Sequence, residues 1–234
     1  MSGERYKTVE KDRGLYLRPT ETIDSGSDAV RTAAGKLTGG LHTEGEKARA
    51  LFYFVRDEIH YNVYMLSTFI EDFRASVVLG RGKGYCVQKA VLLAAMARAA
   101  GIPSRLIFAK IRNHKVPVEL LKQTGVDHFP SHGYTQLFMN GKWISVTPAF
   151  DKALCEKTGV PACDFDGKHD ASLSPVDLAG NPYVEYLEKY EPQADLPFDW
   201  LYGKISPIWG HKRPWMSERD SKGHIMPLSG YRFP

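Results

Sequence analysis

The segment from Cys86 to Ala99 constrains the fold more than any other part of the chain. Its sequence, CVQKAVLLAAMARA, is rich in alanine and leucine, which are strong helix formers, and apolar residues occupy most of its faces. Glycines precede it, Gly101 supplies a C-terminal stop and Pro103 forbids continuation. A helix that is apolar on most faces needs neighbours around it, so we expect a buried central helix.

A second helix is predicted from Glu44 to about Ile59. Thr43 and Glu46 have the spacing of a capping box at its start, and apolar residues then recur at helical spacing. Before it, residues 36–40 (KLTGG) indicate a flexible connection.

Strands are predicted after the central helix. Residues 104–111 (SRLIFAKI) read as one strand, and HGYTQLFM and KWISVTP flank Asn140-Gly141, the strongest short signal for a hairpin. Beyond Asp151 the pattern weakens. Residues 164–170 (DFDGKHD) read as a loop, and Val184 to Tyr190 as one more short helix.

The hairpin register follows from its turn. If the loop is two residues long, Met139 pairs with Lys142 and Tyr134 faces Thr147. Strand alternation then places His132 on the same face as Tyr134 and Thr147. A longer loop would shift this register.

The order of helix, buried helix, strand and hairpin predicts an α+β fold in which a helix packs on an antiparallel sheet. We expect residues 1–234 to form a single domain. Its core spans about 44–151, with an N-terminal segment (1–43) and a C-terminal extension (152–234) packed on the core. The aromatic residues of the last stretch argue against disorder, so we expect it to wrap around the core in an ordered way.

Composition excludes several classes of protein. The chain has 31 Lys and Arg against 27 Asp and Glu, without a continuous basic stripe, so we expect no nucleic-acid partner. No stretch has 18 apolar residues and the first residues are polar, so we expect no membrane span and a cytoplasmic location. Three cysteines are too few, and odd in number, for a disulfide scaffold.

Cys86 is the residue with the clearest chemical potential. A thiol attacks carbonyl carbons only as the thiolate, so a nucleophilic cysteine needs a group that lowers its pKa. At the first turn of a helix, Cys86 faces unpaired N–H groups and the positive end of the helix dipole. The same N–H groups can stabilise an oxyanion. The alternative is a buried cysteine that only packs.

The sequence GYCVQKAVLLAAMARAAGIPSRL, followed by HGYTQLFMNGKWISVTPAFD, resembles the transglutaminase-like branch of the papain-type cysteine enzymes. In that family a glycine-flanked cysteine opens the central helix, a histidine begins a strand, and an acid near the end of the next strand orients the histidine. The resemblance covers roughly Glu46 to Asp151 and implies a cysteine-proteinase-like fold. It implies that Cys86 is the nucleophile and His132 the general base and acid.

The third member of the site departs from the family pattern. The family's acid stands just before the proline of the last strand, where this chain has Thr147 before Pro148. Threonine can accept a hydrogen bond from an imidazole but cannot offset its positive charge. Asp151 is the nearest carboxylate downstream. We therefore expect Asp151 or, less favoured, Thr147 to orient His132, with a remote group or water as the remaining option.

Other candidates are weaker. His128 is a rival general base only four residues before His132, and His114 lies in a polar loop. A metal site is not expected, because the spacing of Cys155, Cys163 and His169 matches no common zinc pattern. The acidic residues of the 164–170 loop also miss the spacing of a calcium-binding EF-hand.

These observations predict acyl transfer through a cysteine thioester, without a metal or cofactor, on a protein, peptide or small amide substrate. Water as acceptor gives a peptidase or amidase, and an amine gives a transglutaminase; the resemblance slightly favours hydrolysis. The alternative is a degenerate member of the family that acts as a binding or scaffold module, which Thr147 supports. A redox-sensing thiol is a third interpretation. The oligomeric state stays open.

Overall fold

The computed structural model describes residues 14–67, 69–116, 128–209, 218–219 and 225–226. Its helices are α2 (Asp28–Thr38), α3 (Glu44–Asp57), α4 (Ala75–Arg81), α5 (Cys86–Ala99), α7 (Lys152–Thr158) and α8 (Phe198–Trp209), with two 3₁₀ turns, η1 (Val63–Met65) and η2 (Ile70–Phe73). Its strands are β1 (His60–Tyr61), β2 (Lys83–Gly84), β3 (Ser104–Asn113), β4 (His128–Met139), β5 (Lys142–Val146), β6 (Val184–Lys189), β7 (Glu218–Arg219) and β8 (Ile225–Met226).

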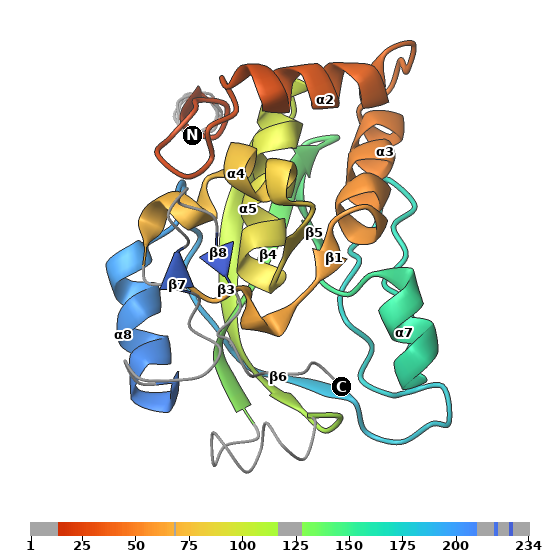
Figure 1. Ribbon diagram of the computed structural model, residues 1–234. Helices are drawn as coiled ribbons and strands as arrows, with labels where there is room; N and C mark the ends of the chain where they lie inside the picture. Colours follow the sequence, from red (N-terminus) through yellow and green to blue (C-terminus); the bar gives the residue numbers. More distant parts are fainter. Residues whose placement is uncertain (1–13, 68, 117–127, 210–217, 220–224, 227–234) are drawn as a thin grey trace, which may run out of the picture.

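The central helix α5 has the predicted bounds, and every residue from Val87 to Arg98 is buried. Helices α2, α3 and α4 pack on one side of it and strands β3 and β4 on the other (Figure 1). The Thr135 hydroxyl in β4 donates to the Ala90 carbonyl at 2.9 Å, which fixes the helix on the sheet. The α+β prediction of a central helix on an antiparallel sheet is confirmed.

The sheet has the order β5-β4-β3-β6, and all its pairs are antiparallel. Met139 pairs with Lys142, as the two-residue loop predicts. Asn140 and Gly141 both have positive φ, 50° and 79°, the backbone that a tight hairpin turn requires. Because Thr135 pairs with Val146, the same register places Thr147 opposite Tyr134.

The predicted short helix from Val184 to Tyr190 is wrong: residues Val184–Lys189 form strand β6. Its sequence, VEYLEK, contains good helix formers, but it pairs with β3 along the edge of the sheet. Val184 is buried whereas Glu185 is exposed, which is the alternation of a strand. Pairing with β3 has overridden the local propensity.

Helix α2 was not expected, and residues 36–38 of the segment predicted to be flexible (36–40) lie in its last turn. Ser27 caps α2 by accepting a hydrogen bond from the Val30 amide. Helix α3 has the predicted capping box of Thr43 and Glu46, but it ends at Asp57, slightly earlier than predicted. Helices α4, α7 and α8 are too short or too weakly patterned to have been predicted.

Segments from the two ends of the chain meet at Arg98, which lies in the last turn of α5 and is buried. Its guanidinium donates to the carbonyls of Arg18 at 2.6 Å, Ala194 at 2.7 Å and Ser104 at 2.9 Å. The Thr22 hydroxyl also donates to the Asp195 carboxylate. The described parts of the N-terminal and C-terminal segments therefore both pack on the core.

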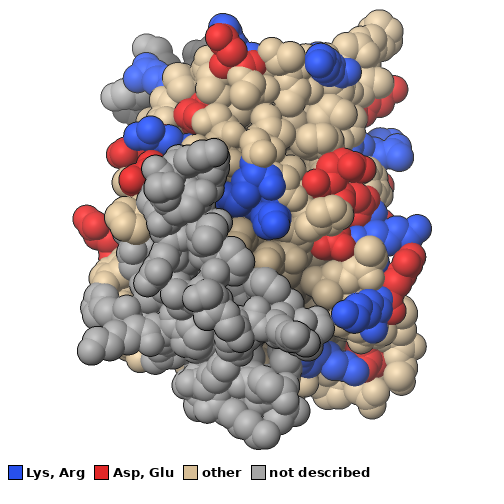
Figure 2. Space-filling model, viewed as in Figure 1, with Lys and Arg blue, Asp and Glu red and all other residues tan. Residues whose placement is uncertain are grey.

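Among the described residues, no helix is long and apolar enough to cross a membrane. On the face in Figure 2, basic and acidic side chains of the described residues lie in small groups separated by uncharged surface.

Candidate active site

The start of α5 is held by hydrogen bonds to the segments before it. The Tyr85 amide donates to Gln88 Oε1 at 3.2 Å, and Gln88 Nε2 donates to the Met65 carbonyl at 3.0 Å. Strand β1 pairs with β2, which leads directly into Tyr85 and Cys86. The first turn of α5 is thus fixed by the Gln88 side chain and by the pairing of β1 with β2.

Cys86 is the first residue of α5 and is partly exposed. Directly beside it, the helix start packs on β4 at Gly133, where an added Cβ would lie 2.9 Å from Val87 Cγ2 and 3.0 Å from Val87 Cα. The thiol faces the backbone N–H of Gly133, in the peptide that joins Gly133 to His132. The fold therefore brings the cysteine to the strand that carries the predicted histidine.

Burial raises the pKa of the Cys86 thiol to about 11. The backbone N–H groups of Gly133, Val87 and Cys86 itself, and the charge of Lys89, act in the opposite direction and favour the thiolate. The helix start thus presents the amide donors expected of a thiolate or oxyanion site, in a setting that keeps the resting thiol protonated.

His132 lies in β4 and is only 3% exposed. Its ring stacks on Tyr134 with centroids 6.1 Å apart and meets the edge of Tyr186 from β6, also at 6.1 Å. Among the described residues its Nε2 has no hydrogen-bond partner. Burial lowers the pKa of His132 to about 4, so the imidazole is neutral at pH 7.

Thr147 follows the last residue of β5 and is fully buried. Its hydroxyl lies near that of Tyr186 and favours the ionised form of that phenol, whose pKa burial raises. The two hydroxyls do not reach hydrogen-bonding geometry, so Thr147 Oγ1 has no partner among the described residues. His132 and Thr147 thus present two unpaired polar atoms around one tyrosine, where the family places an acid.

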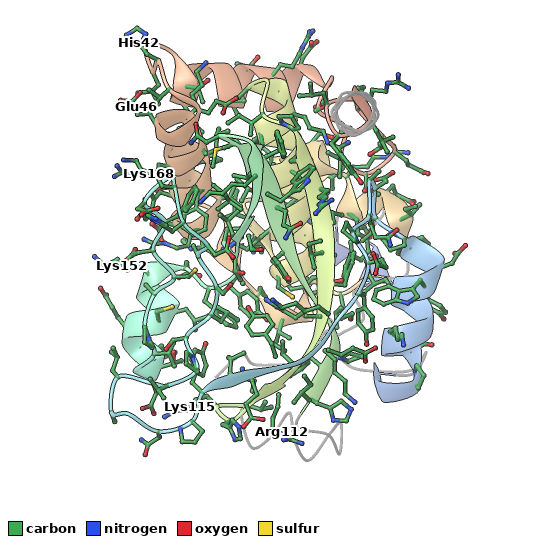
Figure 3. The ribbon with its side chains drawn as sticks, turned by 180° about the vertical axis from the view of Figure 1, so that it is seen from behind. His42, Glu46, Arg112, Lys115, Lys152 and Lys168 are labelled. Carbon is green, nitrogen blue, oxygen red and sulfur yellow. The ribbon has the colours of Figure 1, made fainter. Side chains whose placement is uncertain are left out.

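Asp151, the favoured third member, has another role in this structure. It caps α7, and its carboxylate accepts from the Leu154 amide at 3.0 Å and the Tyr61 amide at 2.9 Å. Both oxygens are therefore engaged by backbone amides. Lys152, the next residue, points outward from the side of the molecule (Figure 3), whereas Asp151 is buried.

The weaker candidates lie in other settings. His128 opens β4 opposite Arg112, and His114 pairs with Glu185 at 2.8 Å. The Cys155 thiol is directed to the Phe150 carbonyl. Within the described ranges, no three His, Cys, Asp or Glu side chains are grouped to hold a metal ion.

The acidic turn at 164–170 is occupied by internal contacts. Asp166 pairs with the His169 ring at 2.6 Å, Asp164 pairs with Arg56 at 2.6 Å, and Asp170 accepts from the Ser145 amide at 2.8 Å.

Three residues near the thiol were missed from the sequence. The hydroxyls of Tyr61 and Tyr85 have pKa values that burial, and then the neighbouring Cys86, raise well above the usual range. Tyr85 Oη is also buried without a partner among the described residues. Lys89 lies one turn after Cys86 and is fully buried. A lysine in a helix that is apolar on most of its faces was the available signal.

The chain matches the model of the transglutaminase-like superfamily over residues 31–148, half of its length. None of the curated proteins matches it. A candidate cysteine protease of Cytophaga hutchinsonii is similar in structure, with a TM-score of 0.46 and 17% identity over 78% of this chain. The periplasmic domain of TgpA from Pseudomonas aeruginosa has a TM-score of 0.43 and 20% identity over 59% of this chain.

This chain spans 54% and 47% of those two structures, about half of each. A candidate protease of Parabacteroides distasonis is covered to 25%, with a TM-score of 0.37 and 20% identity over 60% of this chain. These likenesses are distant, and the family match carries the assignment. The chain belongs to the transglutaminase-like superfamily, the group of cysteine enzymes that its motifs resemble.

Proposed function

We propose that the protein catalyses acyl transfer through a thioester on Cys86, with His132 as general base and acid. The observation that carries this proposal is the position of Cys86. It is the first residue of a buried helix, and its thiol faces the peptide between His132 and Gly133. Membership of the transglutaminase-like superfamily supports it.

In the first step, Cys86 Sγ attacks the carbonyl carbon of an amide or ester while its proton passes to the His132 imidazole. The thiol and the imidazole start neutral, because their pKa values are about 11 and about 4. His132 therefore acts as a base during the attack rather than in the resting state. The oxyanion forms beside the N–H groups of the helix start.

In the second step the carbon–nitrogen bond breaks, and the imidazolium of His132 returns its proton to the leaving amine. The product on the enzyme is a thioester of Cys86. Water then attacks the thioester while His132 takes its proton, which releases a carboxylic acid and restores the thiol. An amine in place of water gives a new amide, and we place hydrolysis first.

The direct experiment is acylation by p-nitrophenyl acetate, followed by p-nitrophenolate release and by intact and peptide mass spectrometry. We expect a burst of one equivalent and an acetyl group on Cys86. Cys86→Ala should lose the burst, and His132→Ala should slow it by about 100-fold or more, the usual contribution of a general base. Adding a primary amine then separates hydrolysis from transamidation by its products.

Cys155→Ala is the matched control, because Cys155 is a buried cysteine in α7 whose thiol is directed to a backbone carbonyl, that of Phe150. It should acylate like the wild type. An acetyl group found on Cys155 or Cys163, or an unchanged rate in His132→Ala, would contradict the proposed site.

The second candidate is a family member that binds a partner without catalysis. The unpaired His132 Nε2 and the neutral Thr147 favour it, because no group of the described residues is bonded to the imidazole to offset an imidazolium charge. In that case p-nitrophenyl acetate labels all three cysteines slowly and His132→Ala changes nothing.

A further inference from the structure

Lys89 is a buried charge that the proposed mechanism does not use. It lies three residues after Cys86 in α5, so the two side chains share one face of the helix. Its side chain is 0% exposed. A buried ammonium is costly unless it is paired and hydrogen-bonded, so its partners indicate what it does.

The Lys89 ammonium donates to two backbone carbonyls, Arg56 at 2.9 Å and Ile59 at 2.6 Å. Both carbonyls stand where α3 ends, and the last carbonyls of a helix carry partial negative charge. The next residues are His60 and Tyr61 of β1. The Lys89 ammonium therefore links the end of α3 to the first turn of α5, the turn that carries the Cys86 thiol.

The charged and titratable groups around Lys89 come from three elements and their caps. Asp57 and Arg56 belong to α3, Asp151 and Cys155 to the start of α7, and Cys86 to α5 itself. Burial lowers the pKa of Lys89 to about 7, while Asp151, Asp57 and Cys155 favour the ammonium and Arg56 opposes it. Below pH 7, this region therefore holds a positive charge one turn from the thiol.

We propose that Lys89 is a positioning residue for the nucleophile, whose ammonium stabilises the Cys86 thiolate from within the helix. This inference rests on the proposed function. With Thr147 where the family has an acid, no carboxylate of the described residues shifts the pKa of His132 towards the imidazolium of a thiolate–imidazolium pair. The Lys89 ammonium favours the thiolate at Cys86, together with the backbone N–H groups of the helix start.

The test is the pH dependence of Cys86 alkylation by iodoacetamide, followed by peptide mass spectrometry. In Lys89→Met the reaction at pH 6.5 should be about tenfold slower, because a thiol pKa higher by about one leaves about tenfold less thiolate. Lys89→Arg keeps a charge and should lie closer to the wild type.

Arg98→Met is the matched control. Arg98 is also a buried cation of α5 that donates to backbone carbonyls, but it lies twelve residues from Cys86, about 18 Å along the helix. Its loss should destabilise the fold and leave the alkylation profile unchanged. If Lys89→Met and the wild type give the same profile, or Arg98→Met shifts it equally, Lys89 is only structural and the inference fails.

If Lys89→Met does not fold, the pH profile of Cys86 alkylation in the wild type provides a second test. As pH rises through about 7, Lys89 loses its charge, so the increase of the alkylation rate should flatten before it resumes. His132→Ala should keep this shoulder. A straight profile from pH 6 to 9 would overturn the inference, whereas loss of the p-nitrophenyl acetate burst would overturn the proposed function.

Discussion

At the scale of single residues, the site combines a thiol that burial keeps protonated with a histidine whose Nε2 has no hydrogen-bond partner among the described residues. Cys86 and His132 are both moved by burial towards their neutral forms. Buried polar atoms without partners are rare in folded proteins, and within the described part of the chain His132 Nε2 and Thr147 Oγ1 are two of them. Their position, where the family has an acid, suggests that a single substitution can restore a charge partner.

We expect Thr147→Asp to raise the pKa of His132, because a carboxylate beside an imidazole favours the imidazolium. Acylation of Cys86 by p-nitrophenyl acetate at pH 6.5 should then be about tenfold faster, for a pKa change of about one. Thr147→Ser, which adds no charge, should match the wild type. A slower reaction in a folded Thr147→Asp protein would show that Thr147 does not face the imidazole.

His132 also makes stability depend on pH. Its pKa is about 4 in the folded protein and about 6.5 in the unfolded chain, so the unfolded state binds more protons between these values. Stability is therefore lost as pH falls from 6.5 to 4, by about 3 kcal/mol. Urea unfolding at pH 7 and pH 4 should show this loss, and His132→Gln should lack it. Equal losses in both proteins would contradict the shifted pKa.

At the scale of elements, the site depends on how closely α5 approaches β4. Gly133 allows this contact, since a Cβ there would meet the Val87 backbone. We expect Gly133→Ala to destabilise the protein by about 2 kcal/mol through overpacking and to slow acylation of Cys86. Thermal unfolding and the ester burst measure the two effects.

Gly80→Ala is the control, because nothing lies within 4 Å of an added Cβ in α4. It should be neutral or slightly stabilising, as alanine is the better helix former. A loss of stability at Gly80→Ala as large as at Gly133→Ala would contradict the packing argument.

Helix α7 gives a test of Asp151. Asp151 caps α7 and accepts from the Tyr61 amide, so Asp151→Ala should destabilise the protein by about 1–2 kcal/mol, whereas Asp151→Asn, which can still cap a helix, should cost less. The rate of Cys86 acylation per folded molecule should fall by less than about tenfold, since no carboxylate is lost from the histidine. A loss of about 100-fold in Asp151→Asn would identify Asp151 as the orienting acid after all.

Local sequence signals predicted some elements well and others not. The bounds of α5, the capping box of α3 and the hairpin at Asn140 follow from short-range chemistry, and all three are confirmed. Strand β6 was predicted as a helix because its residues favour one, and only the partner strand β3 decides otherwise. The role of Asp151 as a cap needed α7, whose seven residues carry no clear period.

At the scale of the whole molecule, the buried cation Arg98 connects regions far apart in the sequence. Replacing it by Met leaves the carbonyls of Arg18, Ala194 and Ser104 without their donor. We expect a loss of about 3 kcal/mol or more, since each unpaired buried polar group costs about 1–3 kcal/mol. Urea unfolding measures it, and Arg105→Met, on the partly exposed side chain of β3, should cost less.

The hydrogen bonds of Arg98 also limit where this protein can be truncated or fused to another domain. The family model spans residues 31–148, yet Arg18 and Ala194 both bind to a side chain inside that span. A gene fragment trimmed to the family boundaries would thus remove two of the acceptors around a buried guanidinium. Fusion partners belong beyond Arg18 and Ala194, because these flanking segments share the buried guanidinium with the core.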